Sequence, residues 1–158
     1  MPNIRRSPTP PRHDPFADGV AELFEAHGWP RLVGRVLGEL LLAEPPHLST
    51  AELCERLNTS KGHLSSAITM LEAMRMIERF GVSGSRQHHY RLASDAFVRA
   101  MHQAIEPSAS LAGLADRALS DAPADSRARV ELTRMRDFYR FLARRLPDLV
   151  AEFEAEAT

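Results

Sequence analysis

A single hairpin pattern in an otherwise helical sequence restricts the fold more than any other feature of this chain. Residues 76–80 and 86–92 are strand-like, and the glycine-rich segment 81–85 between them is typical of a turn. Elsewhere the apolar residues recur at the spacing of an α-helix. The sequence therefore predicts a mainly α-helical protein with one small β-hairpin.

Two helices are expected before residue 45. Asp14 followed by Pro15 is typical of a helix start, because the aspartate caps free N–H groups and proline already has a helical φ angle. The second helix, 31–43, has a wide apolar face and therefore belongs at the centre of the fold. Gly34 and Gly38 lie one turn apart on it, which predicts that another backbone packs closely there.

Two short helices directly precede the hairpin. Ser49 and Glu52 have the spacing of a capping box, which begins a helix that ends near residue 58. After a brief turn a second helix spans 60–74. The order helix, turn, helix, hairpin is that of a winged helix-turn-helix, whose second helix enters the DNA major groove.

The helix 60–74 has one face suited to a protein core and one suited to DNA. Leu64, Ile68 and Leu71 fall on the same side at ~100° per residue. The opposite side is entirely small or polar, which lets the helix approach a duplex closely while donors meet phosphates and base edges. Together with two hairpin residues, the expected DNA-binding residues are Ser60, Lys61, Gly62, His63, Ser65, Ser66, Thr69, Arg86 and Gln87.

The formal net charge of −1 conceals a basic middle and an acidic end. Residues 59–102 contain six basic and three acidic side chains, whereas only acidic residues are charged after Leu146. Local positive charge attracts DNA phosphates. Arg86 lies just past the hairpin tip, where an arginine can enter a narrow minor groove. On position alone, an exposed arginine without a partner is the competing interpretation.

Three further helices are expected after the hairpin. Pro107 and Pro123 separate the segments 94–106 and 109–120 and a last helix that begins near residue 125. Pro147 must kink or break that last helix. Its apolar residues have the spacing of a seam that pairs with another helix. The seam consists of Leu132, Met135, Tyr139, Leu142, Leu146, Leu149 and Phe153.

Residues 28–92 resemble the GbsR-like branch of the MarR (multiple antibiotic resistance regulator) family. The residues that match most specifically are Gly28, Pro30, Arg31, Ser60, Lys61, Gly62 and Ser65. The residues that differ from the usual pattern are His63, Thr69 and Ser85. These differences concern the DNA sequence that is recognised and not the fold.

The resemblance implies a homodimer, joined by its N- and C-terminal helices, that regulates transcription. A twofold dimer would place two recognition helices about 34–36 Å apart and select a pseudo-palindromic operator on double-stranded DNA. A small-molecule effector of unknown identity would act by changing the angle between the dimer helices and the DNA-reading parts. A ligand-responsive repressor is therefore expected. The expected dimerisation residues are Phe16, Val20, Leu23, Leu132, Met135, Tyr139, Leu142 and Leu146.

The chain is expected to divide into four segments. These are a disordered tail 1–14, N-terminal helices 15–45, a winged helix-turn-helix 46–93 and a helical dimerisation region 94–158. No uncharged apolar run approaches the ~20 residues of a membrane span, and the N-terminus lacks the apolar stretch of a secretory signal. We expect a cytoplasmic protein with no membrane partner and no cofactor.

Other functions have less support in the sequence. Cys54 lies on the inner side of a short helix, where cysteine usually acts as a small hydrophobic residue and not as a redox sensor. His88 and His89 point to opposite faces of a strand, so they do not easily share a metal ion. No catalytic motif appears, and no enzyme is expected. A winged-helix module that binds only proteins, or an anti-activator, is the alternative to a DNA-binding regulator.

Overall fold

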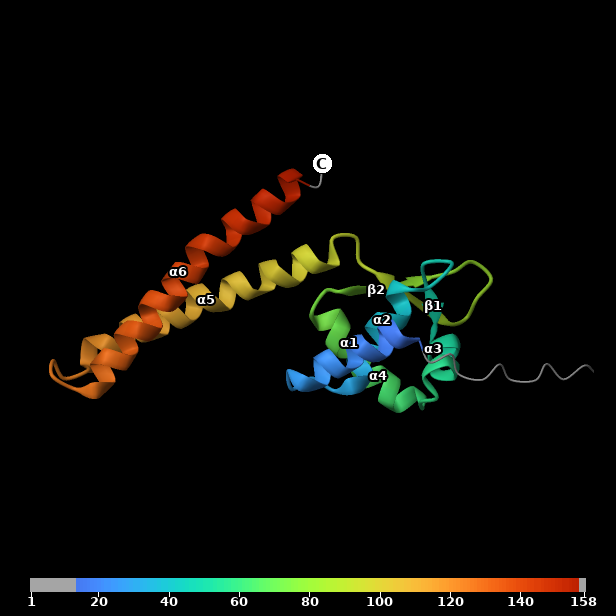
Figure 1. The fold of residues 1–158 in the computed structure, drawn as a ribbon, viewed down its shortest axis with the longest axis horizontal. Coiled ribbons are helices and arrows are strands. Elements are labelled where there is room, and N and C mark those ends of the chain that lie inside the picture. The colour runs from blue at the N-terminus through green and yellow to red at the C-terminus, as the bar shows by residue number, and fades with distance from the viewer. Residues whose placement is uncertain (1–13, 157–158) are drawn as a thin grey trace, which may run out of the picture. The chain divides into compact units, whose positions relative to one another are not determined.

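The computed structural model describes residues 14–156, and the chain in it forms two compact units. The first unit is Met1–Ala96 and the second is Phe97–Thr158. The predicted tail 1–14 lies outside the described residues except for Asp14. Figure 1 shows the order of the elements along the chain.

Four helices and a small sheet make up the first unit. The helices are α1 (Pro15–Ala26), α2 (Arg31–Leu41), α3 (Thr50–Leu57) and α4 (Lys61–Ala73). The predicted helix starts are confirmed: Asp14 Oδ1 accepts a hydrogen bond from the N–H of Phe16 at 2.9 Å. At α3 the capping box between Ser49 and Glu52 is complete, with both reciprocal hydrogen bonds formed. Local side-chain chemistry therefore sets both starts.

The sheet has three antiparallel strands in the order β1-β3-β2. The strands are β1 (Leu48–Ser49), β2 (Ile77–Gly81) and β3 (His88–Leu92). The predicted hairpin is present as β2 and β3, in a register that pairs Ile77 with Leu92 and Gly81 with His88. Strand β1 was not predicted, because two residues are too few to show an alternating pattern.

The close packing predicted at the two glycines of α2 is confirmed against α1. A Cβ atom placed on Gly34 would lie 2.7 Å from the Cα atom of Ala21. One placed on Gly38 would lie 2.6 Å from the Cα atom of Ala17. Both alanines are buried. The two helices therefore touch backbone to backbone, and only glycine fits on the α2 side.

The core of the first unit lies where α2, α3 and α4 meet. Its most completely buried side chains are Leu53, Leu64, Leu71, Val33 and Val36. Because α4 supplies two of these leucines, one face of that helix is fixed to the core and the opposite face is held outward.

Up to Glu156, where the described residues end, the second unit is formed by two helices, α5 (Ala96–Asp121) and α6 (Arg127–Glu156). The prediction of three helices after the hairpin is therefore wrong, because α5 continues through Pro107. Pro147 likewise lies inside α6, so it does not break that helix. Both prolines are exposed. Each ring removes one backbone donor, but at an exposed position no packed neighbour opposes the bend it requires.

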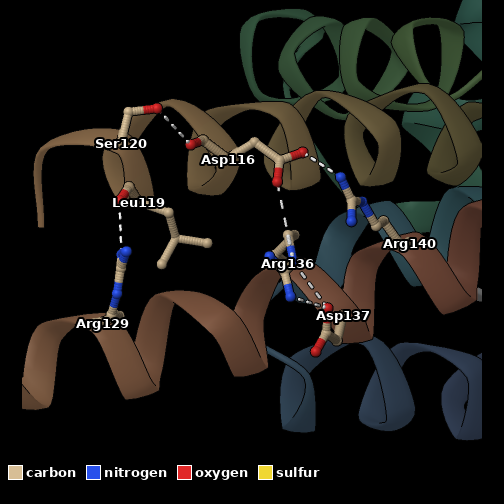
Figure 2. A network of polar contacts seen from close by, with 7 residues as sticks. All are labelled: Asp116, Leu119, Ser120, Arg129, Arg136, Asp137 and Arg140. Carbon is tan, nitrogen blue, oxygen red and sulfur yellow. Dashed lines mark hydrogen bonds and ion pairs between the residues drawn. The ribbon is translucent and has the colours of Figure 1, made fainter. Parts of the chain in front are cut away.

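A polar network joins α5 to α6 (Figure 2). The carboxylate of Asp116 accepts a hydrogen bond from Arg140 at 2.6 Å and lies 4.0 Å from Arg136. Arg129 donates to the carbonyl oxygen of Leu119 at 3.0 Å and so satisfies a free acceptor at the end of α5. These contacts fix the register of the two helices within their unit.

Candidate nucleic-acid interface

Helix α4 is positioned at both ends by local backbone chemistry. Asn58 ends α3 with φ of 47°, a left-handed conformation that asparagine tolerates. The Oγ of Ser60 then accepts a hydrogen bond from the N–H of His63 at 3.3 Å and caps α4. The turn between the two helices is thus short and fixed, as a helix-turn-helix requires.

The outward face of α4 matches the predicted DNA-binding face. Its exposed residues are Lys61, Gly62, His63, Ser65, Ser66, Thr69, Met70 and Ala73. The hydroxyl of Thr69 donates to the carbonyl oxygen of Ser65 at 2.9 Å, which leaves its oxygen free to accept. Apart from Met70, this face offers hydroxyl groups and little bulk, which suits a helix that must approach base edges.

Gly62 has a different role from the glycines of α2. A Cβ atom there would meet nothing nearer than the Oγ of Ser60, at 3.9 Å. Packing inside the protein therefore does not require glycine at this position. A close approach from outside is the remaining physical reason for having no side chain there.

The wing is the turn between β2 and β3. Gly84 has φ of 84°, and the N–H of Ser85 donates to the carbonyl oxygen of Val82 at 3.0 Å. Arg86 and Gln87 are both exposed. The turn therefore presents Arg86 to solvent, as the sequence predicts.

The wing is also tied to the start of α3. The side-chain oxygen of Gln87 accepts a hydrogen bond from the N–H of Ala51 at 3.4 Å, and the hydroxyl of Thr50 donates to the carbonyl oxygen of His88 at 3.3 Å. Gln87 therefore uses one acceptor position of its amide oxygen within the protein, and its amide N–H groups stay available to DNA. Sequence spacing gave no signal for either contact.

Three cations near the interface have no ion-pair partner within residues 14–156: Lys61, Arg75 and Arg86. By contrast, Arg79 makes two hydrogen bonds of 3.1 Å to Glu72, which raise the pKa of its guanidinium. Sequence reasoning missed Arg75. In the sequence, the feature that could have identified Arg75 is its place just after the end of the predicted recognition helix. In the structure its backbone is left-handed, with φ of 53°.

A groove of about 510 Å³ lies between the N-terminus of α2, the turn before α4 and α4 itself. Its wall is largely apolar and its rim is polar. Among the residues that line it are Leu32, Val33, Leu57, Ala67, Met70, Asn58, Thr59, His63 and Ser66. His63 and Ser66 therefore border both the groove and the outward face of α4.

The remaining candidate residues are placed as follows. Cys54 is half-buried and forms no disulfide. His88 is exposed and His89 half-buried, as expected for alternating strand positions. Among the described residues, no group of three histidine, cysteine or acidic side chains is arranged to hold a metal ion. No helix within residues 14–156 is long and apolar enough to cross a membrane.

The predicted dimerisation residues differ in exposure. Phe16 and Leu23 on α1 are 49% and 59% exposed, which leaves apolar surface uncovered there. The predicted dimerisation residues of α6, namely Leu132, Met135, Tyr139, Leu142 and Leu146, are half-buried, whereas Leu149 and Phe153 at the end of the seam are exposed. Further exposed apolar residues on the same helix are Val130, Phe138 and Phe141.

A winged helix-turn-helix with a small polar outward face and unpaired cations beside it defines the class of DNA-binding regulators. Residues 95–156 match the family described as MmpR5-like MarR family transcriptional regulators. The HTH-type transcriptional regulator MmpR5 of Mycobacterium tuberculosis (strain ATCC 25618 / H37Rv) is 35% identical over 141 residues, 87% of this chain and 84% of that protein.

The comparison with solved structures also matches this chain to a transcriptional regulator. The crystal structure of a transcriptional regulator matches with a TM-score of 0.78 and 35% identity, over 89% of this chain and 96% of that one. The chain belongs to the MarR family of transcriptional regulators and is similar to its MmpR5-like members.

Proposed function

We propose that this DNA-binding regulator is a ligand-responsive homodimeric repressor of a pseudo-palindromic operator. The observation that most supports the proposal is the outward face of α4, which is exposed, small and polar and has unpaired Lys61 at its start. A helix N-terminus with a lysine attracts phosphate, since free N–H groups and a positive charge point the same way.

The contacts divide by chemistry. Lys61 and Arg75 contact phosphates, which provides affinity and makes it salt-dependent. Ser66 and Thr69 meet base edges in the major groove, where hydroxyl groups accept or donate hydrogen bonds. Arg86 enters the minor groove beside it. This division predicts that phosphate contacts set affinity for any DNA, whereas α4 and the wing set sequence preference.

Dimerisation follows from the apolar residues left uncovered. Leu23 on α1 and Phe138 on α6 are more than half exposed, and a second copy would remove such side chains from water. One reading helix contacts too few base pairs for selective binding. Two reading helices placed about one DNA turn apart would select a pseudo-palindromic sequence.

Ligand response is proposed to involve the groove beside α4. A molecule seated there would cover His63 and Ser66 and compete directly with DNA. The cations at its rim are already paired, Arg31 with Glu25 at 3.1 Å and Arg35 with Asp18 at 3.8 Å. A neutral molecule with an apolar body therefore suits the groove better than a charged one.

Two finer assignments stay predictions. Placement on the GbsR-like branch depends on the motif Ser60-Lys61-Gly62 and its flanking residues. A cytoplasmic location depends on the features of the sequence alone.

Selection of DNA by the purified full chain tests the proposed function. Fragments retained from a random library should share two half-sites with twofold symmetry, and raising the salt concentration should weaken the complex steeply. Light scattering should give the mass of a dimer. Retention of no DNA would contradict the proposal and favour a module that binds only proteins or an anti-activator.

A further inference from the structure

We infer that His89 is a positioning residue for the wing: through Ser85 it fixes the turn that presents Arg86 to DNA. The inference depends on the proposed role of Arg86 in the minor groove. It concerns a histidine that does not itself reach the tip of the wing.

The contact between β3 and the turn is made by one hydroxyl group. The Nε2 atom of His89 lies 3.3 Å from the Oγ of Ser85. The same Oγ accepts a hydrogen bond from the N–H of Gln87 at 3.1 Å. A hydroxyl has one donor and two acceptor sites, so both bonds form together. Arg86 lies between Ser85 and Gln87, so the hydrogen bond from the N–H of Gln87 to the Oγ of Ser85 closes a turn around its backbone.

The ring of His89 is held in place by packing. It lies 5.3 Å from the ring of His47 and 5.9 Å from that of Phe80, measured between centroids, and the rings of His47 and Phe80 are 5.4 Å apart. The backbone of His89 pairs with Ser49 in the sheet. A fixed ring can hold a mobile turn, whereas a freely rotating one could not.

The two histidines of this cluster differ in one respect. The Nδ1 atoms of both are buried and have no hydrogen-bond partner within the described part of the chain. Only His89 uses its other ring nitrogen, and it does so on Ser85. For His47, packing explains the ring, and phenylalanine would serve equally well. For His89, packing explains the ring but not its Nε2, whose contact is with the wing.

The other end of the wing is already secured. The bonds from Thr50 to the carbonyl oxygen of His88 and from Ala51 to Gln87 hold the start of β3 on α3. The segment left to be fixed is therefore the tip, at Ser85 and Arg86. Loss of the His89 contact should free this tip and leave the sheet intact.

The experiment measures affinity for the DNA selected above by fluorescence anisotropy, with the full-length chain. His89→Phe keeps an aromatic ring but removes Nε2, and we expect about five-fold weaker binding at an unchanged melting temperature. His47→Phe is the matched control, because it alters the same cluster without touching the wing, and it should bind like the parent protein.

Two further comparisons separate positioning from a purely structural role. Ser85→Ala should weaken binding as His89→Phe does, whereas Ser85→Thr keeps the hydroxyl and should restore it. In a protein that already carries Arg86→Ala, His89→Phe should cause no further loss of DNA affinity, because the arginine side chain that His89 positions is gone.

Each outcome decides the inference. Normal binding by both His89→Phe and Ser85→Ala, in a protein that Arg86→Ala weakens, would overturn it while leaving the proposed function intact. An equal loss in His47→Phe, or an additive loss in the Arg86→Ala background, would show general disruption instead. If Arg86→Ala itself binds normally, the wing has no part in DNA binding and the inference fails with it.

Discussion

Asp116 of α5 holds Arg140 of α6 at 2.6 Å, and the same carboxylate lies 4.0 Å from Arg136, one helical turn away (Figure 2). One acidic side chain thus faces two arginines across the helix pair. Asp137 competes for Arg136 at 2.8 Å, and this contact lowers the pKa of Asp137 and raises that of the guanidinium.

Replacement of Asp116 should loosen the helix pair without unfolding it. Because the Arg140 and Asp116 side chains are 52% and 40% exposed, Asp116→Asn should lower the free energy of unfolding by about 0.5 kcal/mol. Asp148→Asn is the control, since its contact with Arg145 lies within α6. Denaturant unfolding measures both, and an equal effect of the two changes would contradict the role assigned to Asp116.

The capping box predicts a pH dependence of stability. Hydrogen bonds from the side chain and the backbone of Ser49 lower the pKa of Glu52 below its ordinary value of 4.5. A lowered pKa in the folded state adds stability above the ordinary pKa, which is lost as the pH falls through the folded value. Glu52→Gln should therefore be destabilising at pH 7, and its effect in thermal melts should shrink as the pH is lowered below the ordinary pKa. A loss that does not change with pH would be against this assignment.

The glycines of α2 should not tolerate a side chain. A Cβ atom on Gly38 would meet Ala17 at 2.6 Å, so Gly38→Ala should cost about 1–3 kcal/mol of stability. Gly19 in α1 has nothing within 4 Å of such an atom, and Gly19→Ala should stabilise by about 0.5–1 kcal/mol. Chemical denaturation of the two variants should give shifts of opposite sign, and shifts of the same sign would refute the prediction.

Removal of the wing arginine should weaken DNA binding selectively. Arg86→Ala should reduce affinity for the selected DNA about ten-fold and leave the oligomeric state of the protein unchanged. Arg91→Ala is a suitable control, because that arginine is paired with Glu78 at 3.2 Å and lies over the ring of Phe80. A loss of affinity no greater than that of Arg91→Ala would argue against a special role for Arg86.

Charged substitutions test the proposed dimer. Leu142→Asp should convert the dimer to monomers, as should Leu23→Asp, which alters a side chain that is 59% exposed within one chain and so should not disturb its folding. Leu42→Asp is the control, because it changes another exposed leucine, with 47% exposure, outside the predicted interface. Light scattering at several concentrations distinguishes the three. A stable dimer from both test variants would exclude these surfaces.

The sequence predicted the parts of the fold that depend on local chemistry. Caps at Asp14 and Ser49, and the two glycines of α2, could be recognised because each needs only a few neighbouring residues. Strand β1 depends on pairing with β3, some 40 positions along the chain, and left no local pattern.

The long helices and the wing show the same limit. The cost of a proline inside a helix depends on what surrounds it, so the sequence alone placed a break at Pro107 where α5 continues. The exposed face of α4 followed from helical spacing. The second bond of Ser85, to His89, joins residues only four positions apart, but it depends on the conformation of the turn, which the sequence pattern does not specify.

The attachment of the wing to α3 has a consequence for the operator. Because Gln87 and His88 are hydrogen-bonded to Ala51 and Thr50, the wing is attached to α3, the helix that leads into the reading helix α4, and we expect the wing and α4 to keep a fixed spacing on the DNA. An extra base pair inserted between the bases that the two elements touch would throw one of them out of phase with the double helix. In the proposed dimer, the spacing between half-sites would depend on how the two copies join and not on this attachment. We therefore expect operators to tolerate changes in the spacing between half-sites differently from changes within a half-site.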